Sequence, residues 1–175
     1  MEQIIPLRDR RKVQVTTRFS PGDVGRIASF HGEVYGMEYG LGPKFEGYVA
    51  RTVGAFAENY DSEAGTERIW LAFPEGTQEL VSCCAVIRGE ENKAQFRWFL
   101  TAPSFRGAGL GRFLFSEAVD FSRAAGYESL YLLTADFLPA AASLYQSFGF
   151  TVTAQKPFSG WEVPFTEHRY ERYFT

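Results

Sequence analysis

The chain has 175 residues, of which 45% are hydrophobic and 17% aromatic, and this composition excludes an intrinsically disordered segment. Its formal net charge of −3 argues against a general nucleic-acid-binding protein, because such proteins are usually basic. No apolar run approaches the ~20 residues that a membrane span requires. The length suits one domain with a sizeable core, and a single domain over residues 1–175 is expected.

The two cysteines, Cys83 and Cys84, are adjacent in an apolar segment that is expected to form a strand. Successive side chains of a strand point to opposite faces, so neither a disulfide between them nor a shared metal is expected. His31 and His168 are the only histidines, and we predict no metal site. Unpaired cysteines and an N-terminus without the apolar stretch of a signal peptide predict a reducing, cytoplasmic location.

The first third of the chain predicts a tail, a strand and two helices. Residues 1–12 end in a basic run and are expected to be a solvated N-terminal tail. Ser20 is expected to cap the first helix, with Pro21 at its first position and Asp23 at its third. A glycine-rich loop leads to a second helix, whose apolar face comprises Phe45, Val49, Thr52 and Phe56.

Apolar runs in the rest of the chain predict further strands, interrupted by two more helices. Including the first, strands are expected at residues 13–18, 68–73, 79–88, 93–100 and 130–134. A third helix follows Gly109 and ends near Gly126, a residue type that suits the position just after a helix. A fourth helix carries Tyr145, and two C-terminal strands complete the order β-α-α-β-β-β-α-β-α-β-β.

The segment from Arg106 to Arg112 reads Arg-Gly-Ala-Gly-Leu-Gly-Arg and joins a predicted strand to the third helix. Its alternating glycines leave backbone N–H groups uncovered at a helix N-terminus, which suits a pyrophosphate. A Walker loop needs Lys and then Ser or Thr after the last glycine, where Arg112 and Phe113 stand here. The G-x-G-x-G spacing also disfavours a dinucleotide fingerprint. The structural alternative is a glycine-rich turn that merely connects two elements.

A second motif, A-x-x-L-Y-x-x-x-G-F, runs from Ala141 through Tyr145 to Phe150. In this order and spacing, the two motifs resemble those of the GCN5-related N-acetyltransferase (GNAT) family, and the resemblance covers nearly the whole chain. The segments 31–40 and 97–100 are similar to those of a subgroup often fused behind a MarR-type DNA-binding domain. On that likeness, this chain would be the catalytic module alone.

The resemblance implies an α/β (α+β) GNAT fold. Such a fold has a mixed, mostly antiparallel twisted sheet of about seven strands, with splayed central parallel strands and about four helices. It also implies that acetyl-CoA, as cosubstrate, lies between the two splayed strands, which here end at Leu100 and Thr134.

Further implications of the resemblance concern individual residues. The backbone of Phe99, Leu100 and Thr101 would pair with the pantetheine arm, and an N–H of Leu100 or Thr101 would stabilise the oxyanion. Asp136 is implied as another cofactor contact, next to Ala135, where the subgroup has asparagine. The residues implied to hold the pyrophosphate are Gly107, Ala108, Gly109, Leu110, Gly111 and Arg112, with Arg106 and Arg112 adding positive charge.

Four side chains are candidates for catalysis, and each has a structural alternative. Tyr145 stands where the family places the acid that protonates the leaving thiolate, but it also shares a helix face with apolar residues. Glu33 and Glu38 are candidates for the base or for receiving the charge of the acceptor, and solvated helix-end acids are the alternative. His31 lies on an apolar stripe and is expected to be a core histidine.

Together these features predict an N-acetyltransferase that transfers acetyl from acetyl-CoA directly to a primary amine. The acceptor is expected to be a small molecule, with a peptide N-terminus or lysine as the alternative. No nucleic acid or membrane partner is expected, and the protein is expected to be a monomer or homodimer. The alternative is a non-catalytic acyl-CoA-binding sensor or partner module.

Overall fold

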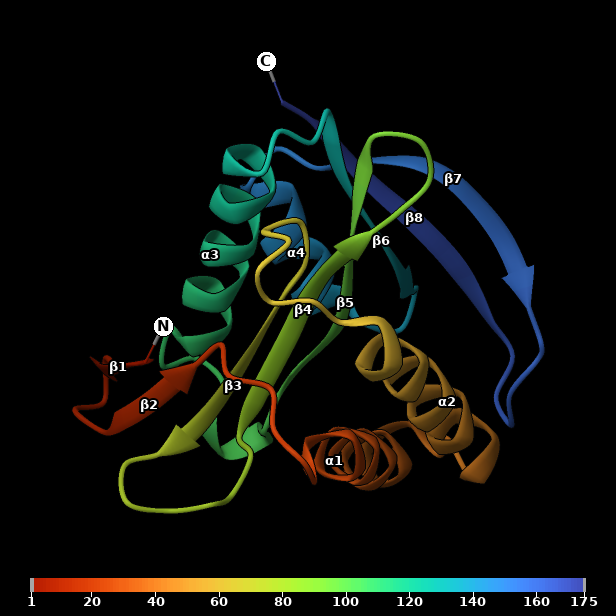
Figure 1. Ribbon diagram of the computed structural model, residues 1–175. Coiled ribbons are helices and arrows are strands. Elements are labelled where there is room, and N and C mark those ends of the chain that lie inside the picture. The colour runs from red at the N-terminus through yellow and green to blue at the C-terminus, as the bar shows by residue number, and fades with distance from the viewer. Residues whose placement is uncertain (1, 175) are drawn as a thin grey trace.

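The computed structural model describes residues 2–174, which contain an eight-stranded mixed sheet (Figure 1). The spatial order is β1-β2-β3-β4-β5-β6-β8-β7, and every neighbouring pair is antiparallel except the central pair β5 and β6. The strands are β1 (Glu2–Pro6), β2 (Lys12–Thr16), β3 (Arg68–Pro74), β4 (Ser82–Arg88), β5 (Lys93–Thr101), β6 (Ser129–Ala135), β7 (Thr151–Phe158) and β8 (Phe165–Tyr173). The expected fold class is confirmed, with eight strands rather than about seven.

Four helices cover the two faces of this sheet within residues 2–174, with α1 and α2 on one face and α3 and α4 on the other (Figure 1). They are α1 (Asp23–Tyr39), α2 (Pro43–Asn59), α3 (Leu110–Ala124) and α4 (Pro139–Ser147), and a 3₁₀ turn occupies Pro103–Phe105. None of the four is long and apolar enough to cross a membrane.

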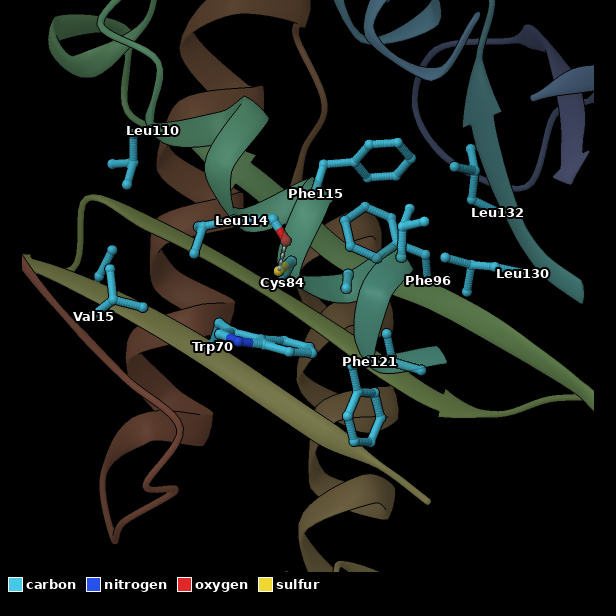
Figure 2. Packing of buried hydrophobic residues seen from close by; sticks show 14 of the residues in the cluster. Val15, Trp70, Cys84, Phe96, Leu110, Leu114, Phe115, Phe121, Leu130 and Leu132 are labelled. Carbon is cyan, nitrogen blue, oxygen red and sulfur yellow. Dashed lines mark hydrogen bonds between the residues drawn. The ribbon is translucent and has the colours of Figure 1, made fainter. Parts of the chain in front are cut away.

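Each face of the sheet has its own hydrophobic cluster. On one face, Leu114 and Phe115 of α3 pack over Trp70 and other strand residues (Figure 2). Cys84 lies in this cluster, where its thiol donates to the Leu114 carbonyl at 3.9 Å, and Cys83 lies in the cluster under α1 and α2. The prediction that the two cysteines face opposite sides of the sheet is therefore confirmed. Full burial of a leucine or phenylalanine contributes about 1.5–3 kcal/mol, so both helix layers are firmly attached.

The N-terminal segment differs from the expected tail. Residues 2–6 form β1, which pairs with β2 as the edge of the sheet. The turn between them is anchored by Leu7, whose side chain is only 7% exposed. A buried leucine and strand pairing outweigh the polar character of the basic run that follows.

The first helix begins later than predicted, at Asp23 rather than after Ser20. Gly22 precedes it at φ +97°, a conformation outside the helix that favours glycine. The Asp23 carboxylate accepts a hydrogen bond from the backbone N–H of Ser20 at 2.7 Å. The sequence predicts that Ser20 caps the helix with its side chain, but in the structure the Asp23 side chain accepts the hydrogen bond and the Ser20 backbone donates it.

The parallel pair β5 and β6 separates part-way along its length. Backbone pairing between the two strands ends at Phe96 and Leu132, although both strands continue. Just beyond that point Trp98 has φ +48°, and the register between β4 and β5 shifts. This irregularity turns the end of β5 away from β6 and leaves one edge of its backbone unpaired.

Candidate functional site

A cavity of about 600 Å³ opens where β5 and β6 separate. Its lining comes from both sides of the sheet: from α1 and α2, from the ends of β5 and β6, from the glycine-rich loop, from α4 and from β8. It therefore brings residues of both sequence motifs to one space. Volumes of this order are typical of small-molecule sites.

The glycine-rich loop forms one end of the cavity. Gly107 has φ +75° and Gly109 has φ +96°, and Gly109 immediately precedes α3. Both line the cavity with Gly111, whereas Ala108 and Leu110 are buried in the core. The N–H groups of the first helical turn have no partner within the helix. Because the glycine backbone faces the cavity beside these N–H groups, the loop is suited to binding a pyrophosphate.

Gly111 sits against β5. A Cβ atom placed on Gly111 would lie 3.2 Å from the ring of Phe99 and 3.3 Å from the hydroxyl of Thr101. Such spacing is tighter than an ordinary side-chain contact, so glycine allows the helix to start this close to the strand.

Arg106 lines the cavity, but its charge is already paired. Its two terminal nitrogens each donate to the Glu38 carboxylate at 2.8 Å, and its Nε donates to the Thr101 carbonyl at 3.0 Å. This bidentate pair joins the C-terminal end of α1 to the loop after β5. Glu38 is therefore engaged with Arg106 in this structure, and it does not line the cavity.

A further arginine, which the sequence predicts to lie in a solvated tail, lies beside the loop. Arg8 lines the cavity, and its Nε is 3.6 Å from the position that a Cβ on Gly109 would occupy. Its backbone N–H donates to the Ala108 carbonyl at 3.1 Å, which fixes the β1–β2 turn to the loop. No carboxylate among residues 2–174 pairs with the Arg8 guanidinium. Arg112, in contrast, donates to the Ser147 hydroxyl at 2.9 Å.

Replacing Arg8 by glutamine is expected to weaken CoA binding roughly tenfold, because a charge-assisted contact to phosphate is lost. Isothermal titration calorimetry with CoA and with 3′-dephospho-CoA measures the loss and shows which phosphate is involved. Arg10→Gln is the matched control, since Arg10 is exposed in the same turn and does not line the cavity. Equal affinities for the two variants would contradict a phosphate contact from Arg8.

The β5 end of the cavity presents Phe99, Leu100 and Thr101, and all three line it. On the β4 side this stretch is paired, and the Ser82 hydroxyl also donates to the Leu100 carbonyl at 2.8 Å. The opposite edge is free of β6 and faces the cavity. An unpaired strand edge can receive an extended chain such as a pantetheine arm.

Tyr145 of α4 lines the same cavity and is 5% exposed. Its ring packs against Phe115 at 5.1 Å and Tyr170 at 5.7 Å between centroids, so the aromatic body belongs to the core. Burial raises the pKa of Tyr145 well above its ordinary value, with smaller contributions from nearby Tyr35, Cys84 and Tyr170. The phenol is therefore protonated at neutral pH and can donate a hydrogen bond.

His31 also contacts the cavity, although its side chain is only 4% exposed. Its Nδ1 lies 2.8 Å from the Ile27 carbonyl, and because that oxygen only accepts, Nδ1 carries the proton. The ring stacks on Tyr35 with an interplanar angle of 3°. Burial lowers the pKa of His31 to about 4, partly opposed by the bond to Ile27. His31 is therefore buried, as expected of a core histidine, and it also forms part of the cavity wall.

The lowered pKa of His31 predicts that the protein loses stability in mild acid. Between pH 6.5 and about 4 the unfolded chain binds a proton at His31 that the folded chain does not, so unfolding becomes easier as pH falls. The expected loss is about 3 kcal/mol across this window. Urea unfolding at pH 7 and pH 4.5 measures it. The free energy of unfolding of His31→Leu should depend less on pH than that of the parent, whereas His168→Leu, the control, should keep the parent's pH dependence. The same pH dependence in both variants would contradict the assignment of this effect to His31.

The remaining predicted residues lie outside the cavity lining. Glu33 is exposed on α1 and accepts a hydrogen bond from Ser29 at 2.7 Å. Asp136 is exposed in the turn after β6, while its neighbours Ala135 and Phe137 line the cavity. Glu167 of β8 is the carboxylate that does line it, and no motif in the sequence had indicated this residue.

A family model described as an acetyltransferase (GNAT) domain matches residues 65–152, a range that includes the glycine-rich loop and the second motif. The chain belongs to the GNAT family of acetyl-CoA-dependent N-acetyltransferases. A 51-residue stretch is 45% identical to an uncharacterized N-acetyltransferase of Schizosaccharomyces pombe. That match covers 29% of this chain and 31% of the length of the yeast protein.

Solved structures share the fold over nearly the whole GNAT chain. A Streptococcus agalactiae acetyltransferase superposes with a TM-score of 0.72 at 21% identity, covering 93% of this chain and 98% of that one. A Staphylococcus aureus GNAT acetyltransferase gives 0.72 at 16% identity, with 92% and 98% covered. A spermidine N-acetyltransferase chimera from Vibrio cholerae and hSSAT gives 0.65 at 19% identity, with 92% and 95% covered.

Proposed function

We propose that this chain transfers the acetyl group of acetyl-CoA directly to a primary amine of a small molecule. One observation carries the proposal: the glycine-rich loop, the open edge of β5 and the Tyr145 hydroxyl-bearing ring line a single cavity. Together these features would supply a phosphate site, a channel for the pantetheine arm and a proton donor to one bound acetyl-CoA.

In the proposed reaction the amine nitrogen attacks the thioester carbonyl, a C–N bond forms and the C–S bond breaks. The amine must lose a proton, because alkyl amines are almost entirely charged at neutral pH. A backbone N–H of Leu100 or Thr101 would stabilise the oxyanion, and Tyr145 would donate its hydrogen bond to the leaving sulfur, which ends as a thiol. The charged amine loses two protons in all. The first leaves to a base or to water before the attack, and the second, lost from nitrogen once the C–N bond has formed, balances the proton gained by the sulfur.

Direct transfer is supported by the state of the cysteines. Cys83 and Cys84 are fully buried, and neither lines the cavity. Burial raises the pKa of both thiols, so they remain protonated and poorly nucleophilic. An acetyl-cysteine intermediate at either position is therefore disfavoured.

The test is release of the CoA thiol from acetyl-CoA in the presence of a panel of primary amines, with the acetylated products identified by mass spectrometry. We expect amine-dependent thiol release and a matching N-acetyl product. Tight acetyl-CoA binding without any product would instead support the sensor or partner module. The likeness to the acetyltransferase half of MarR–GNAT fusion proteins and the oligomeric state stay predictions.

A further inference from the structure

Part of the cavity is lined by aromatic rings that touch in a closed circuit. In order, the centroid distances are Tyr35–Tyr39 5.5 Å, Tyr39–Phe137 4.8 Å, Phe137–Phe165 5.6 Å, Phe165–Trp161 5.5 Å, Trp161–Phe45 4.9 Å and Phe45–Tyr35 4.9 Å. All six residues line the cavity, and we call them the aromatic collar.

The collar is assembled from distant parts of the chain. Its members come from α1, α2, the turn after β6, the loop between β7 and β8, and β8 itself. Phe45 is buried, while the other five rings are only partly covered by the protein. Ring surface that faces a cavity and is not covered by neighbours is suited to an apolar, flat ligand.

The charged groups of the cavity limit the acceptor further. Four arginines line it, but Glu167 is the one carboxylate that does so among the described residues. The Glu167 side chain is 15% exposed, and its partner Lys156, at 3.0 Å, is 68% exposed and so binds it weakly. One carboxylate can receive one ammonium group, whereas a polyamine would bring further positive charges towards arginines.

We propose that the acceptor is a monoamine that carries an aromatic ring, seated in the aromatic collar with its ammonium group received by Glu167. This inference rests on the proposed N-acetyltransferase function, because it names the substrate class of the same site. The collar supplies ring-to-ring contacts, and Glu167 supplies the single opposite charge.

The first test compares kcat/KM for phenethylamine, butylamine and spermidine at saturating acetyl-CoA. We expect phenethylamine to exceed butylamine by roughly 10- to 100-fold, because the collar buries its ring. Spermidine is expected to be the poorest acceptor of the three. Equal values for phenethylamine and butylamine, or a preference for spermidine, would overturn the proposal.

The second test uses Phe137→Leu, which keeps apolar volume and removes an aromatic ring from the collar. The KM for phenethylamine is expected to rise roughly three- to tenfold with little change in kcat. Phe19→Leu is the matched control, because Phe19 packs against Phe56 and Tyr60 and does not line the cavity. An unchanged KM in Phe137→Leu, or an equal rise in both variants, would overturn the role of the collar.

Glu167→Gln tests the charge in the same assay, with Glu33→Gln as control. The KM for phenethylamine should rise about tenfold only in Glu167→Gln, while Glu33→Gln should match the parent. A rise in Glu33→Gln alone would assign the amine to Glu33 instead and overturn this part of the proposal.

Binding without turnover separates this inference from the proposed function. Phenethylamine is titrated calorimetrically into the protein saturated with CoA, so no acetyl group is present. Binding that weakens in Phe137→Leu but not in Phe19→Leu supports the collar even if no amine is acetylated. Absence of phenethylamine binding to the parent would overturn the collar even if another amine is turned over.

Discussion

Gly109→Val is expected to abolish CoA binding. Gly109 has φ +96° directly before α3, a backbone conformation that a β-branched residue does not readily adopt. A valine there would also place methyl groups beside Arg8, at the entrance to the first helical turn. Both effects remove the N–H groups of that turn from the pyrophosphate. Calorimetric titration with CoA should show an affinity loss of at least about 10²-fold, in the range expected when several charge-assisted bonds are lost.

A control is needed because strain alone destabilises the protein by about 1–3 kcal/mol. Gly65→Val provides it, since Gly65 has φ +68°, has open space around its Cβ position and does not line the cavity. We expect the two variants to lose similar thermal stability while Gly65→Val retains CoA affinity. A folded Gly109→Val protein with parental affinity would remove the loop from the phosphate site.

Local sequence signals were sufficient for the elements that carry the two motifs. The alternating glycines and the apolar stripe after them predict the loop and α3, because turn conformation and helix periodicity are encoded within a few residues. The structure places Gly107, Gly109 and Gly111 on the cavity and Leu110 in the core, as such a pattern requires. The position of Tyr145 in the cavity was predictable only through the resemblance to a family.

Contacts between distant segments were not predictable in this way. The pairing of Arg106 with Glu38 joins residues 68 positions apart, and nothing near either residue indicates it. The charged neighbours of Arg8 predict a solvated tail, whereas β1 pairing and buried Leu7 hold Arg8 at the loop. Glu167 faces the cavity only because β8 lies beside β6.

The aromatic collar is the clearest example of contacts between distant segments that the sequence does not predict. Its members look like ordinary core aromatics in the sequence, because helix and strand periodicity indicate only that a ring faces inward. Whether an inward ring meets other rings or a cavity depends on how the helices and loops pack over the open end of the sheet. That packing is tertiary, and it places Tyr39 against Phe137 across 98 positions of sequence at 4.8 Å.

Tyr145→Phe is expected to lower kcat by roughly 10²-fold or more with little change in affinity for CoA. The variant keeps the ring that packs on Phe115 and removes only the hydroxyl that would donate to the leaving sulfur. Because burial raises the pKa of Tyr145, the parent should keep this donor protonated throughout the neutral range.

Tyr170→Phe is the matched control for the hydroxyl of Tyr145. Tyr170 is also buried and lies 5.7 Å from Tyr145 between ring centroids, but it does not line the cavity. Losing its hydroxyl should leave kcat unchanged, so a loss confined to Tyr145→Phe reports on chemistry rather than packing. Steady-state rates with the best amine of the panel decide between the two roles. If Tyr145→Phe stays within a factor of two of the parent, Tyr145 is a core aromatic, and the leaving thiolate takes its proton from water or another group.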